Sequence, residues 1–97
     1  MFRHCVMFRW KPGTGDDVKA AIAAGLNELA HLEGVLSYTH GADLGLRDDN
    51  WDYVVVGDFV DEAAYRGYAT DPGHVELIQT LIVPNIEERA GAQYVVG

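Results

Sequence analysis

The residues best suited to chemistry lie in one short stretch that runs from Tyr65 to His74. Within it Asp71 is a good N-cap, and Pro72 fits the first helical position because the N–H that proline lacks would be unpaired there. His74 therefore falls in the first turn of a new helix, where the positive end of the helix dipole disfavours a charged imidazole. Because a neutral imidazole can act as a general base, the stretch predicts a site of proton abstraction, with the phenol of Tyr68 as a nearby donor. The alternative is that His74 is only a polar residue in a helical turn.

Two strands contribute further candidate residues. Alternation along the first predicted strand places His4, Phe8 and Trp10 on one face. Tyr53 begins the apolar centre of a later strand. We expect these four side chains to line a substrate-binding cavity, since aromatic walls suit a flat organic molecule. The alternatives are that the aromatic residues are core, and that His4 is a buried histidine bonded to the backbone or to a tyrosine.

Other kinds of chemistry lack the residues that they need. The four histidines show neither HxH nor HxxxH spacing, so no metal site is predicted. The glycine-containing segments at residues 13–15 and 41–45 lack the lysine of a phosphate-binding loop. No Ser/His/Asp or Cys/His pattern points to a covalent intermediate. We therefore expect a site that works without a cofactor.

Length and composition restrict the class of protein. The 97 residues are the size of one domain, and nothing divides residues 1–97 into parts. Seven basic residues are scattered, 15 residues are acidic and the formal net charge is −8, so binding to nucleic acid or to an anionic membrane surface is not expected. No apolar run is long enough for a membrane span, and the first residues lack the layout of a signal peptide. The single cysteine, Cys5, suits a reducing compartment, and we expect a cytoplasmic protein.

Hydrophobic periodicity predicts four strands and three helices. The strands are expected at residues 2–10, 35–44, 51–59 and 90–96, and the helices at residues 14–34, from residue 61 through Tyr68, and at residues 74–83. Pro84 is expected to end the last helix, and residues 86–89 to form a connector. The order β-α-β-β-α-β is the split βαβ pattern of ferredoxin-like folds, here with the second helical region divided in two. The prediction is an α+β fold with a four-stranded antiparallel sheet.

The sheet of such a fold has one face without helices, and this chain has no further element to cover it. The first and third strands are central in the topology, and both are apolar on each face in this sequence. We assign to the uncovered face the side chains of His4, Val6, Phe8, Trp10, Tyr53, Val55 and Phe59. Left exposed, they would form a large apolar patch. We therefore predict that a second copy covers this face in a two-fold homodimer, which gives a dimeric α/β barrel.

Two segments of the sequence resemble a known family. The opening strand, with its early histidine His4, and the pattern Tyr-x-x-Asp-Pro-x-His at residues 68–74 are similar to motifs of the stress-responsive dimeric α/β-barrel (Dabb) family. The resemblance covers nearly all 97 residues and implies a ferredoxin-like fold that dimerises. A common form of the family has histidine where this chain has Asp71, and most members have no assigned reaction.

One branch of that family, of the olivetolic acid cyclase type, consists of polyketide cyclases, and the resemblance implies roles for individual residues. His74 would correspond to the catalytic base, Tyr68 to the hydrogen-bonding phenol and His4 to a further histidine of the cavity. Another cavity histidine of that branch, on the third strand, is replaced here by Tyr53.

These observations lead to one main hypothesis and three alternatives. In the main hypothesis the chain is an enzyme without cofactor that binds a small apolar or aromatic, polyketide-like molecule. His74 removes a proton next to a carbonyl group, Tyr68 stabilises the enolate oxygen, and the product is cyclised or isomerised. The alternatives are a non-catalytic dimeric ligand-binding or stress-associated protein, a structural dimer whose barrel is filled by side chains, and a haem- or quinone-type monooxygenase.

Overall fold

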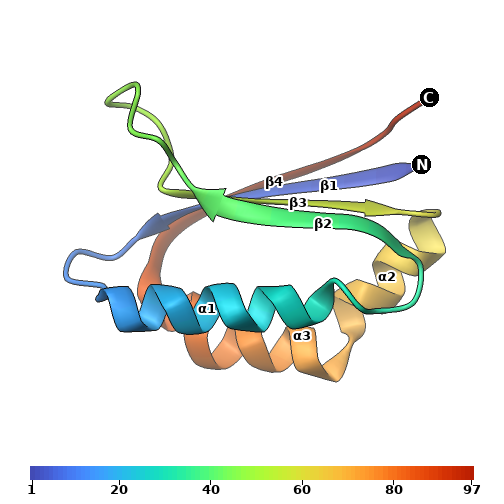
Figure 1. Cartoon of the computed structure of the whole chain (residues 1–97), viewed down its shortest axis with the longest axis horizontal. Helices are drawn as coiled ribbons and strands as arrows, with labels where there is room; N and C mark the ends of the chain where they lie inside the picture. Colours follow the sequence, from blue (N-terminus) through green and yellow to red (C-terminus); the bar gives the residue numbers. More distant parts are fainter.

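A four-stranded antiparallel sheet with helices on one face only forms the computed structural model of the chain, which describes residues 1–97 (Figure 1). In chain order the elements are β1 (Phe2–Trp10), α1 (Asp16–Leu29), β2 (Val35–Ala42), β3 (Tyr53–Phe59), α2 (Glu62–Thr70), α3 (Pro72–Leu77), the π-helical segment η1 (Ile78–Ile82), α4 (Val83–Asn85) and β4 (Ile86–Val95). The strand order β2-β3-β1-β4 places β1 and β3 at the centre, so the predicted ferredoxin-like α+β fold is confirmed. None of the helices combines the length and the apolar character that crossing a bilayer requires.

The last strand is longer than predicted. Residues 86–89, expected as a connector, belong to β4 and pair with the end of β1, so that Arg89 lies opposite Phe8. Their charged side chains give little strand signal, but pairing with β1 supplies the backbone hydrogen bonds. Pro84 does not end the helix either. It lies in α4, which continues directly from η1 and ends one residue later, at Asn85.

Three other elements are shorter than predicted. The first helix begins at Asp16 and ends at Leu29, and turns follow as far as Gly34, whose φ of +82° suits glycine. The second strand ends at Ala42, and the third begins at Tyr53. The element types are unchanged, so these differences affect only where the connecting loops begin.

The bulkier face of the two central strands packs beneath the helices, and our assignment of this face to the dimer was wrong. His4, Val6 and Phe8 of β1 are buried within the single chain, as are Tyr53 and Val55 of β3. The buried hydrophobic residues of this core are Val6, Phe8, Ile22, Leu26, Leu29, Tyr53, Val55, Phe59, Tyr68, Leu77 and Ile82, with Trp10 packed against them. Alternation tells which residues share a face, but not which face the helices cover. Helices over the larger side chains remove more apolar area from water.

Close packing of α1 against α3 holds the helix layer together. In α1 the side chains of Ile22, Leu26 and Leu29 are buried. A Cβ atom at Gly25 would lie 2.6 Å from the Cδ1 atom of Leu77 in α3, so the missing side chain lets the two helices approach each other. This contact helps to set the position of α3, and with it the space between the helices and the sheet.

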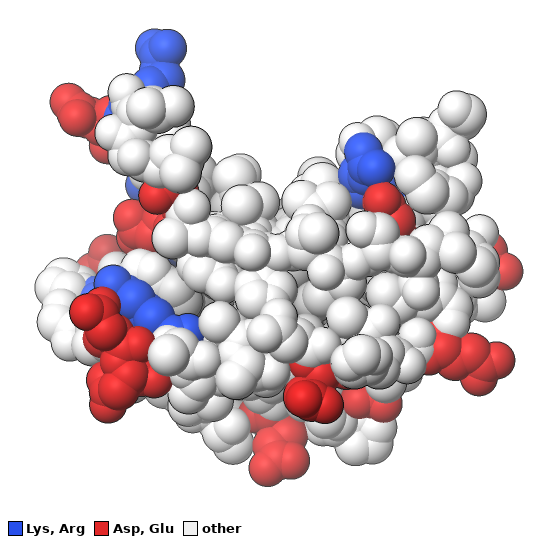
Figure 2. Space-filling view, viewed as in Figure 1, with Lys and Arg blue, Asp and Glu red and all other residues white.

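The face without helices is hollowed and carries smaller side chains. In Figure 1 the β2–β3 loop rises from this side of the sheet at one end and the chain termini lie at the other, and Figure 2 shows the hollow between these two projections. Alternation places Cys5 and Met7 of β1, and Val54 and Val56 of β3, on this outer face. Met7 and Val54 are 36% and 37% exposed, respectively, so the single chain leaves part of this face open to water.

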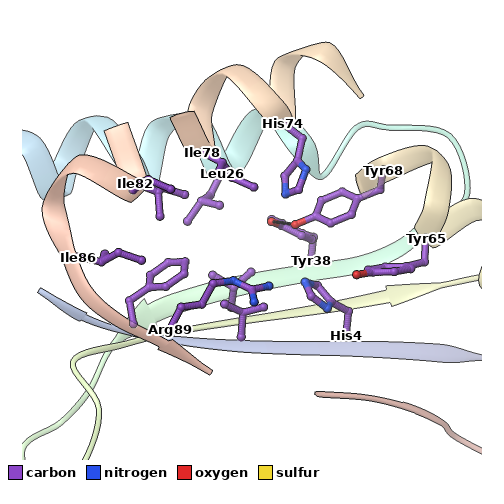
Figure 3. A pocket seen from close by; sticks show the side chains of 14 residues that line it. His4, Leu26, Tyr38, Tyr65, Tyr68, His74, Ile78, Ile82, Ile86 and Arg89 are labelled. Atoms are coloured by element: carbon purple, nitrogen blue, oxygen red, sulfur yellow. Dashed lines mark hydrogen bonds between the residues drawn. The ribbon is translucent and has the colours of Figure 1, made fainter. Parts of the chain in front are cut away.

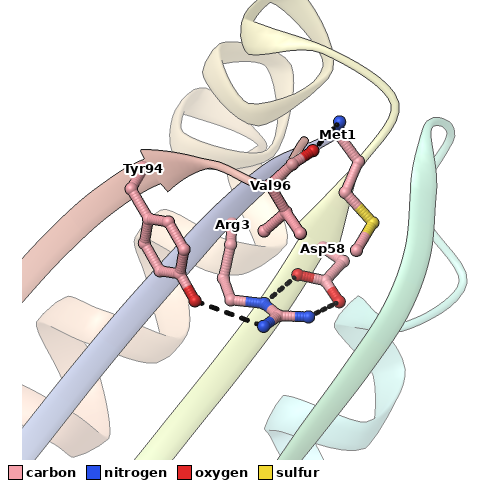
Figure 4. A network of polar contacts seen from close by, with 5 residues as sticks. All are labelled: Met1, Arg3, Asp58, Tyr94 and Val96. Atoms are coloured by element: carbon pink, nitrogen blue, oxygen red, sulfur yellow. Dashed lines mark hydrogen bonds and ion pairs between the residues drawn. The ribbon is translucent and has the colours of Figure 1, made fainter.

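An ion pair lies on the outer face near the chain ends (Figure 4). The guanidinium of Arg3 donates from Nε to Oδ1 of Asp58 at 2.7 Å and from Nη2 to Oδ2 at 2.9 Å. Its Nη1 donates to the hydroxyl oxygen of Tyr94 at 3.2 Å. Hydrogen bonding to Arg3 lowers the pKa of the Asp58 carboxyl. The network joins three adjacent strands, and the Met1 ammonium, which donates to the Val96 carbonyl at 3.0 Å, joins the two chain ends beside it.

Candidate functional site

A cavity of about 80 Å³ lies between the inner face of the sheet and the layer formed by α2, α3 and η1 (Figure 3). Aliphatic and aromatic side chains form most of its wall. The side chains that bring polar atoms to it are His4, Tyr38, Tyr65, Tyr68, His74 and Arg89. The structure thus brings four of the predicted site residues together, namely His74, Tyr68, His4 and Phe8.

His74 is held by the turn before its helix. The Asp71 carboxylate accepts hydrogen bonds from the backbone N–H groups of Gly73, at 2.9 Å, and of His74, at 3.2 Å, as an N-cap does. The Nδ1 atom of His74 lies 3.2 Å from the carbonyl oxygen of Ala69. Because a carbonyl can only accept, Nδ1 carries the hydrogen and the neutral ring has its free electron pair on Nε2. Figure 3 shows the ring pointing from α3 into the cavity, so Nε2 can take a proton from a molecule bound there.

Burial keeps His74 neutral. Burial lowers the pKa of the imidazole because the cavity solvates the cation poorly. The Ala69 carbonyl and the Asp71 carboxylate oppose this effect, and the positive charge of Arg89 adds to it. The sequence argument relied on the helix dipole, whereas burial is the main cause in the structure.

Tyr68 lies beside His74 and forms a pair with a second tyrosine. Its ring centroid is 4.2 Å from that of His74, and its hydroxyl oxygen is 2.8 Å from the hydroxyl oxygen of Tyr38. Burial raises the pKa of both phenols, so both keep their hydrogens at neutral pH. One of the two hydrogens makes the bond between them. The other is free to be donated to an oxygen atom in the cavity.

His4 approaches the same cavity from the sheet. It is only 3% exposed, and its Nδ1 accepts a hydrogen bond of 2.8 Å from the side-chain amide of Gln93 on β4. Burial, with the charge of Arg89 as the next contribution, lowers the pKa of His4 to about 4. Its partner is thus neither the backbone nor a tyrosine. Because the helices cover this face of β1, His4 and His74 line one cavity from opposite walls (Figure 3).

Trp10 and Tyr53 lie outside this cavity. The Tyr53 ring is nearly parallel to that of Phe8, at 6.4 Å, and packs against Trp10 at 5.6 Å. The Tyr53 hydroxyl donates to Nδ1 of His40 at 2.6 Å, and Nε2 of His40 donates to the side-chain oxygen of Asn27 at 2.6 Å. The geometry gives both aromatic residues a packing position and gives Tyr53 a hydrogen-bonding partner.

Comparison with known proteins assigns the chain to a family. Residues 2–96 match the family model described as Stress Responsive A/B Barrel Domain. The chain belongs to the Dabb family. Among the curated proteins, none matches the sequence.

Solved structures of similar proteins agree with the Dabb fold. A dimeric ferredoxin-like protein of unknown function from Thermobifida fusca is 31% identical, with a TM-score of 0.90 over 98% of this chain and 90% of that one. A Dabb family protein from Mesorhizobium loti is 24% identical, with a TM-score of 0.82 over 98% and 95% of the two chains. The hydroxynitrile lyase from Passiflora edulis is 21% identical, with a TM-score of 0.86 over 99% and 93%. The last two establish a shared fold alone.

Three polar residues at the cavity of this Dabb chain were missed in the sequence. Tyr38 alternates inward along β2, but its bond to Tyr68 joins residues 30 positions apart, which periodicity cannot reveal. Tyr65 begins the stretch that the sequence singled out but received no role there, although it lies one turn before Tyr68 on α2 and helical spacing could have assigned it to the site. Arg89 was placed in a connector. Groups of three or more His, Cys, Asp or Glu side chains that could hold a metal ion do not occur in the structure.

Proposed function

We propose that this Dabb protein is a homodimer that holds a small apolar or aromatic molecule in the cavity and uses His74 as a general base, without a cofactor. One observation carries the proposal. The hydrogen bond from Nδ1 of His74 to the Ala69 carbonyl leaves Nε2 unprotonated, in an apolar cavity, next to a pair of neutral phenols. A cytoplasmic location is part of the proposal and is supported by the use of a single cysteine.

The reaction would begin at a carbon next to a carbonyl group. Nε2 of His74 takes the proton, the C–H bond breaks, and its electron pair moves onto the carbonyl oxygen. The free hydrogen of the Tyr38–Tyr68 pair is donated to that oxygen. Protonation at a different atom gives an isomer, and attack of the enolate carbon on a second carbonyl of the same molecule gives a ring, with the proton returned from Nε2. General base catalysis contributes roughly 10²–10⁴-fold to such a rate.

The size of the cavity limits the substrate. A volume of about 80 Å³ is well below the roughly 300–1,000 Å³ of sites for drug-sized ligands. A long polyketide would therefore need side chains of the wall to move. The cavity favours a small carbonyl compound.

The outer face of the sheet supports the homodimer. Within the chain Met7 and Val54 are exposed, and Cys5 and Val56 are only half-buried. The hollow between the β2–β3 loop and the chain ends could receive the same surface of a second copy (Figure 2). The relative from T. fusca, at 31% identity, is described as dimeric. In a two-fold dimer, the outer face of each subunit would cover the outer face of the other.

Exchange of carbon-bound hydrogen tests the catalytic proposal without a known substrate. Small ketones and 1,3-diketones are incubated in D₂O with the protein, and loss of the α-proton signal is followed by NMR. We expect exchange to be accelerated by the wild type, lost in His74→Ala and reduced in Tyr68→Phe. The matched control is His31→Ala, since His31 is exposed and does not line the cavity. Full exchange in His74→Ala would rule out this base.

A non-catalytic ligand-binding protein is the second candidate. It is favoured by the bond between the Tyr68 and Tyr38 hydroxyls, because a phenol that is already bonded is not fully available to a reacting oxygen. This candidate predicts saturable binding of small aromatic molecules with no exchange above the rate of buffer alone.

A further inference from the structure

The proposed function leaves one polar group of the cavity unused, the guanidinium of Arg89. Three of the other arginines are paired with carboxylates, namely Arg3, Arg9 and Arg66. Arg47 has no such partner either, and it lies in the β2–β3 loop outside the cavity lining. Arg89 is exposed as well, but its side chain lines the cavity. Arg89 is thus the one arginine that lines the cavity, and its side chain makes no ion pair and no hydrogen bond.

The strand directs Arg89 into the cavity. Arg89 lies opposite Phe8 in the pairing of β4 with β1, and therefore on the inner face of the sheet. In Figure 3 its side chain runs along the sheet side of the cavity toward His4, with His74 and Tyr68 on the opposite wall. A Cβ atom at Gly91, two residues along the same face, would lie 3.4 Å from both terminal nitrogens of Arg89. The absence of a side chain there leaves that side of the guanidinium uncovered.

The charge of Arg89 is not balanced within the cavity. No Asp or Glu side chain lines the cavity, burial keeps His4 and His74 neutral, and the lining tyrosines Tyr38 and Tyr68 keep their hydrogens. A chain with a formal net charge of −8 thus presents one unpaired positive charge to a cavity whose other lining side chains are uncharged. A guanidinium is planar, stays charged and offers paired donors, which match a carboxylate better than they match a neutral oxygen.

We infer that Arg89 binds the carboxylate of the molecule that occupies the cavity, so that the occupant is a small oxo acid with an apolar or aromatic body. This inference rests on the proposed function for the place of the carbonyl group. Figure 3 shows Arg89 on the sheet side of the cavity and His74 and Tyr68 on the opposite wall. A molecule whose carboxylate binds Arg89 would therefore direct its carbonyl group toward the Tyr38–Tyr68 pair and the adjacent C–H toward Nε2 of His74. Arg89 is then the residue that selects an anionic substrate, and His74 is the base that acts on it.

Matched pairs of acids and amides test the inference. Binding of 2-oxobutanoate and 2-oxobutanamide, and of benzoate and benzamide, is measured by NMR titration at fixed ionic strength. We expect the wild type to prefer each acid roughly 10–100-fold, the range for hydrogen bonds to a charged group. The preference should disappear in Arg89→Gln, with amide binding unchanged. It should persist in Arg47→Gln, which removes the same charge from an exposed loop. Arg89→Lys retains the charge and should retain part of the preference.

Two results would overturn the inference. One is equal binding of acid and amide by the wild type. The other is Arg89-dependent binding of methyl phosphate as tight as that of the acids, which would make the site one for phosphate. The hydrogen-exchange assay with neutral ketones separates this inference from the proposed function when it is run well above pH 6.5. There His74 is neutral with or without the charge of Arg89, and a neutral ketone has no carboxylate for Arg89 to bind. If the wild type shows no preference for acids but still accelerates exchange, the anion site alone is refuted. If it prefers acids but does not accelerate exchange, the base alone is refuted.

Discussion

The Nδ1 atom of His74 lies 3.2 Å from the carbonyl oxygen of Ala69, and this contact decides which nitrogen of the ring is free. Ala69 belongs to the end of α2 and His74 to the first turn of α3, so the short turn between the two helices orients the imidazole. The tautomer of the base is therefore fixed by the backbone and does not depend on the other side chains of the cavity. The predictions below concern this ring, the tyrosine pair beside it, the buried His4 and the outer face of the sheet.

The proton-abstraction activity should persist in mildly acidic solution. Burial lowers the pKa of His74 from its ordinary value of 6.5, so the free base remains the main form below that pH. In Arg89→Gln the midpoint should move upward, since the charge of Arg89 contributes to the lowering. The measurement is the pH dependence of exchange, or an NMR titration of the His74 ring. A midpoint at or above 6.5 in the wild type would contradict the buried position of the ring.

Tyr38→Phe should destabilise the fold more than the loss of one oxygen atom suggests. The change leaves the Tyr68 hydroxyl buried without its partner, which costs about 1–3 kcal/mol in the free energy of unfolding. The double variant Tyr38→Phe/Tyr68→Phe removes both hydroxyls and should lose less than the sum of the single variants. Urea denaturation of the four proteins measures the coupling. Additive losses would show that the two hydroxyls do not stabilise each other.

His4 should make the stability of the fold depend on pH between about 4 and 6.5. In this range the unfolded chain binds a proton at His4 and the folded chain does not, so stability is full above pH 6.5 and falls as the pH falls toward about 4. One such group contributes a slope of up to ~1.4 kcal/mol per pH unit. Denaturation of His4→Gln at several pH values should show a shallower slope than the wild type. His31→Gln, which changes an exposed histidine, serves as the control. An equal slope in His4→Gln and the wild type would refute this assignment.

Val54→Glu should separate the proposed dimer while the subunit remains folded. Val54 lies on the outer face of β3, where an unpaired carboxylate buried between two sheets would cost several kcal/mol. Light scattering at micromolar concentration should report twice the subunit mass for the wild type and one subunit for the variant, with unchanged circular dichroism. Val60→Glu adds the same charge at an exposed position after β3 and should stay dimeric. A wild type of single-subunit mass would refute the dimer.

Much of the architecture was readable from local patterns. Alternation in residues 2–10 identified β1 with its correct bounds. The Asp71-Pro72 pair indicated the N-cap and first residue of α3, although periodicity placed the helix at residues 74–83. These signals depend on residues close together in the chain, and so they can be recognised without the tertiary structure. The charged start of β4 was missed because its strand conformation comes from pairing with β1 and not from its own residues.

The amino-acid sequence by itself determined the order of the elements, the residues that share each face and the place of His74 in a first helical turn. Spacing and capping alone produce these features, and they involve neighbours a few residues apart. Only the tertiary structure decided that the helices cover the face of His4, that Tyr38 reaches Tyr68, and that Arg89 points into the same cavity. Each of these depends on how distant segments pack, because the side of the sheet that the helices cover and the pairing of its edge strands are set by the whole chain folding at once.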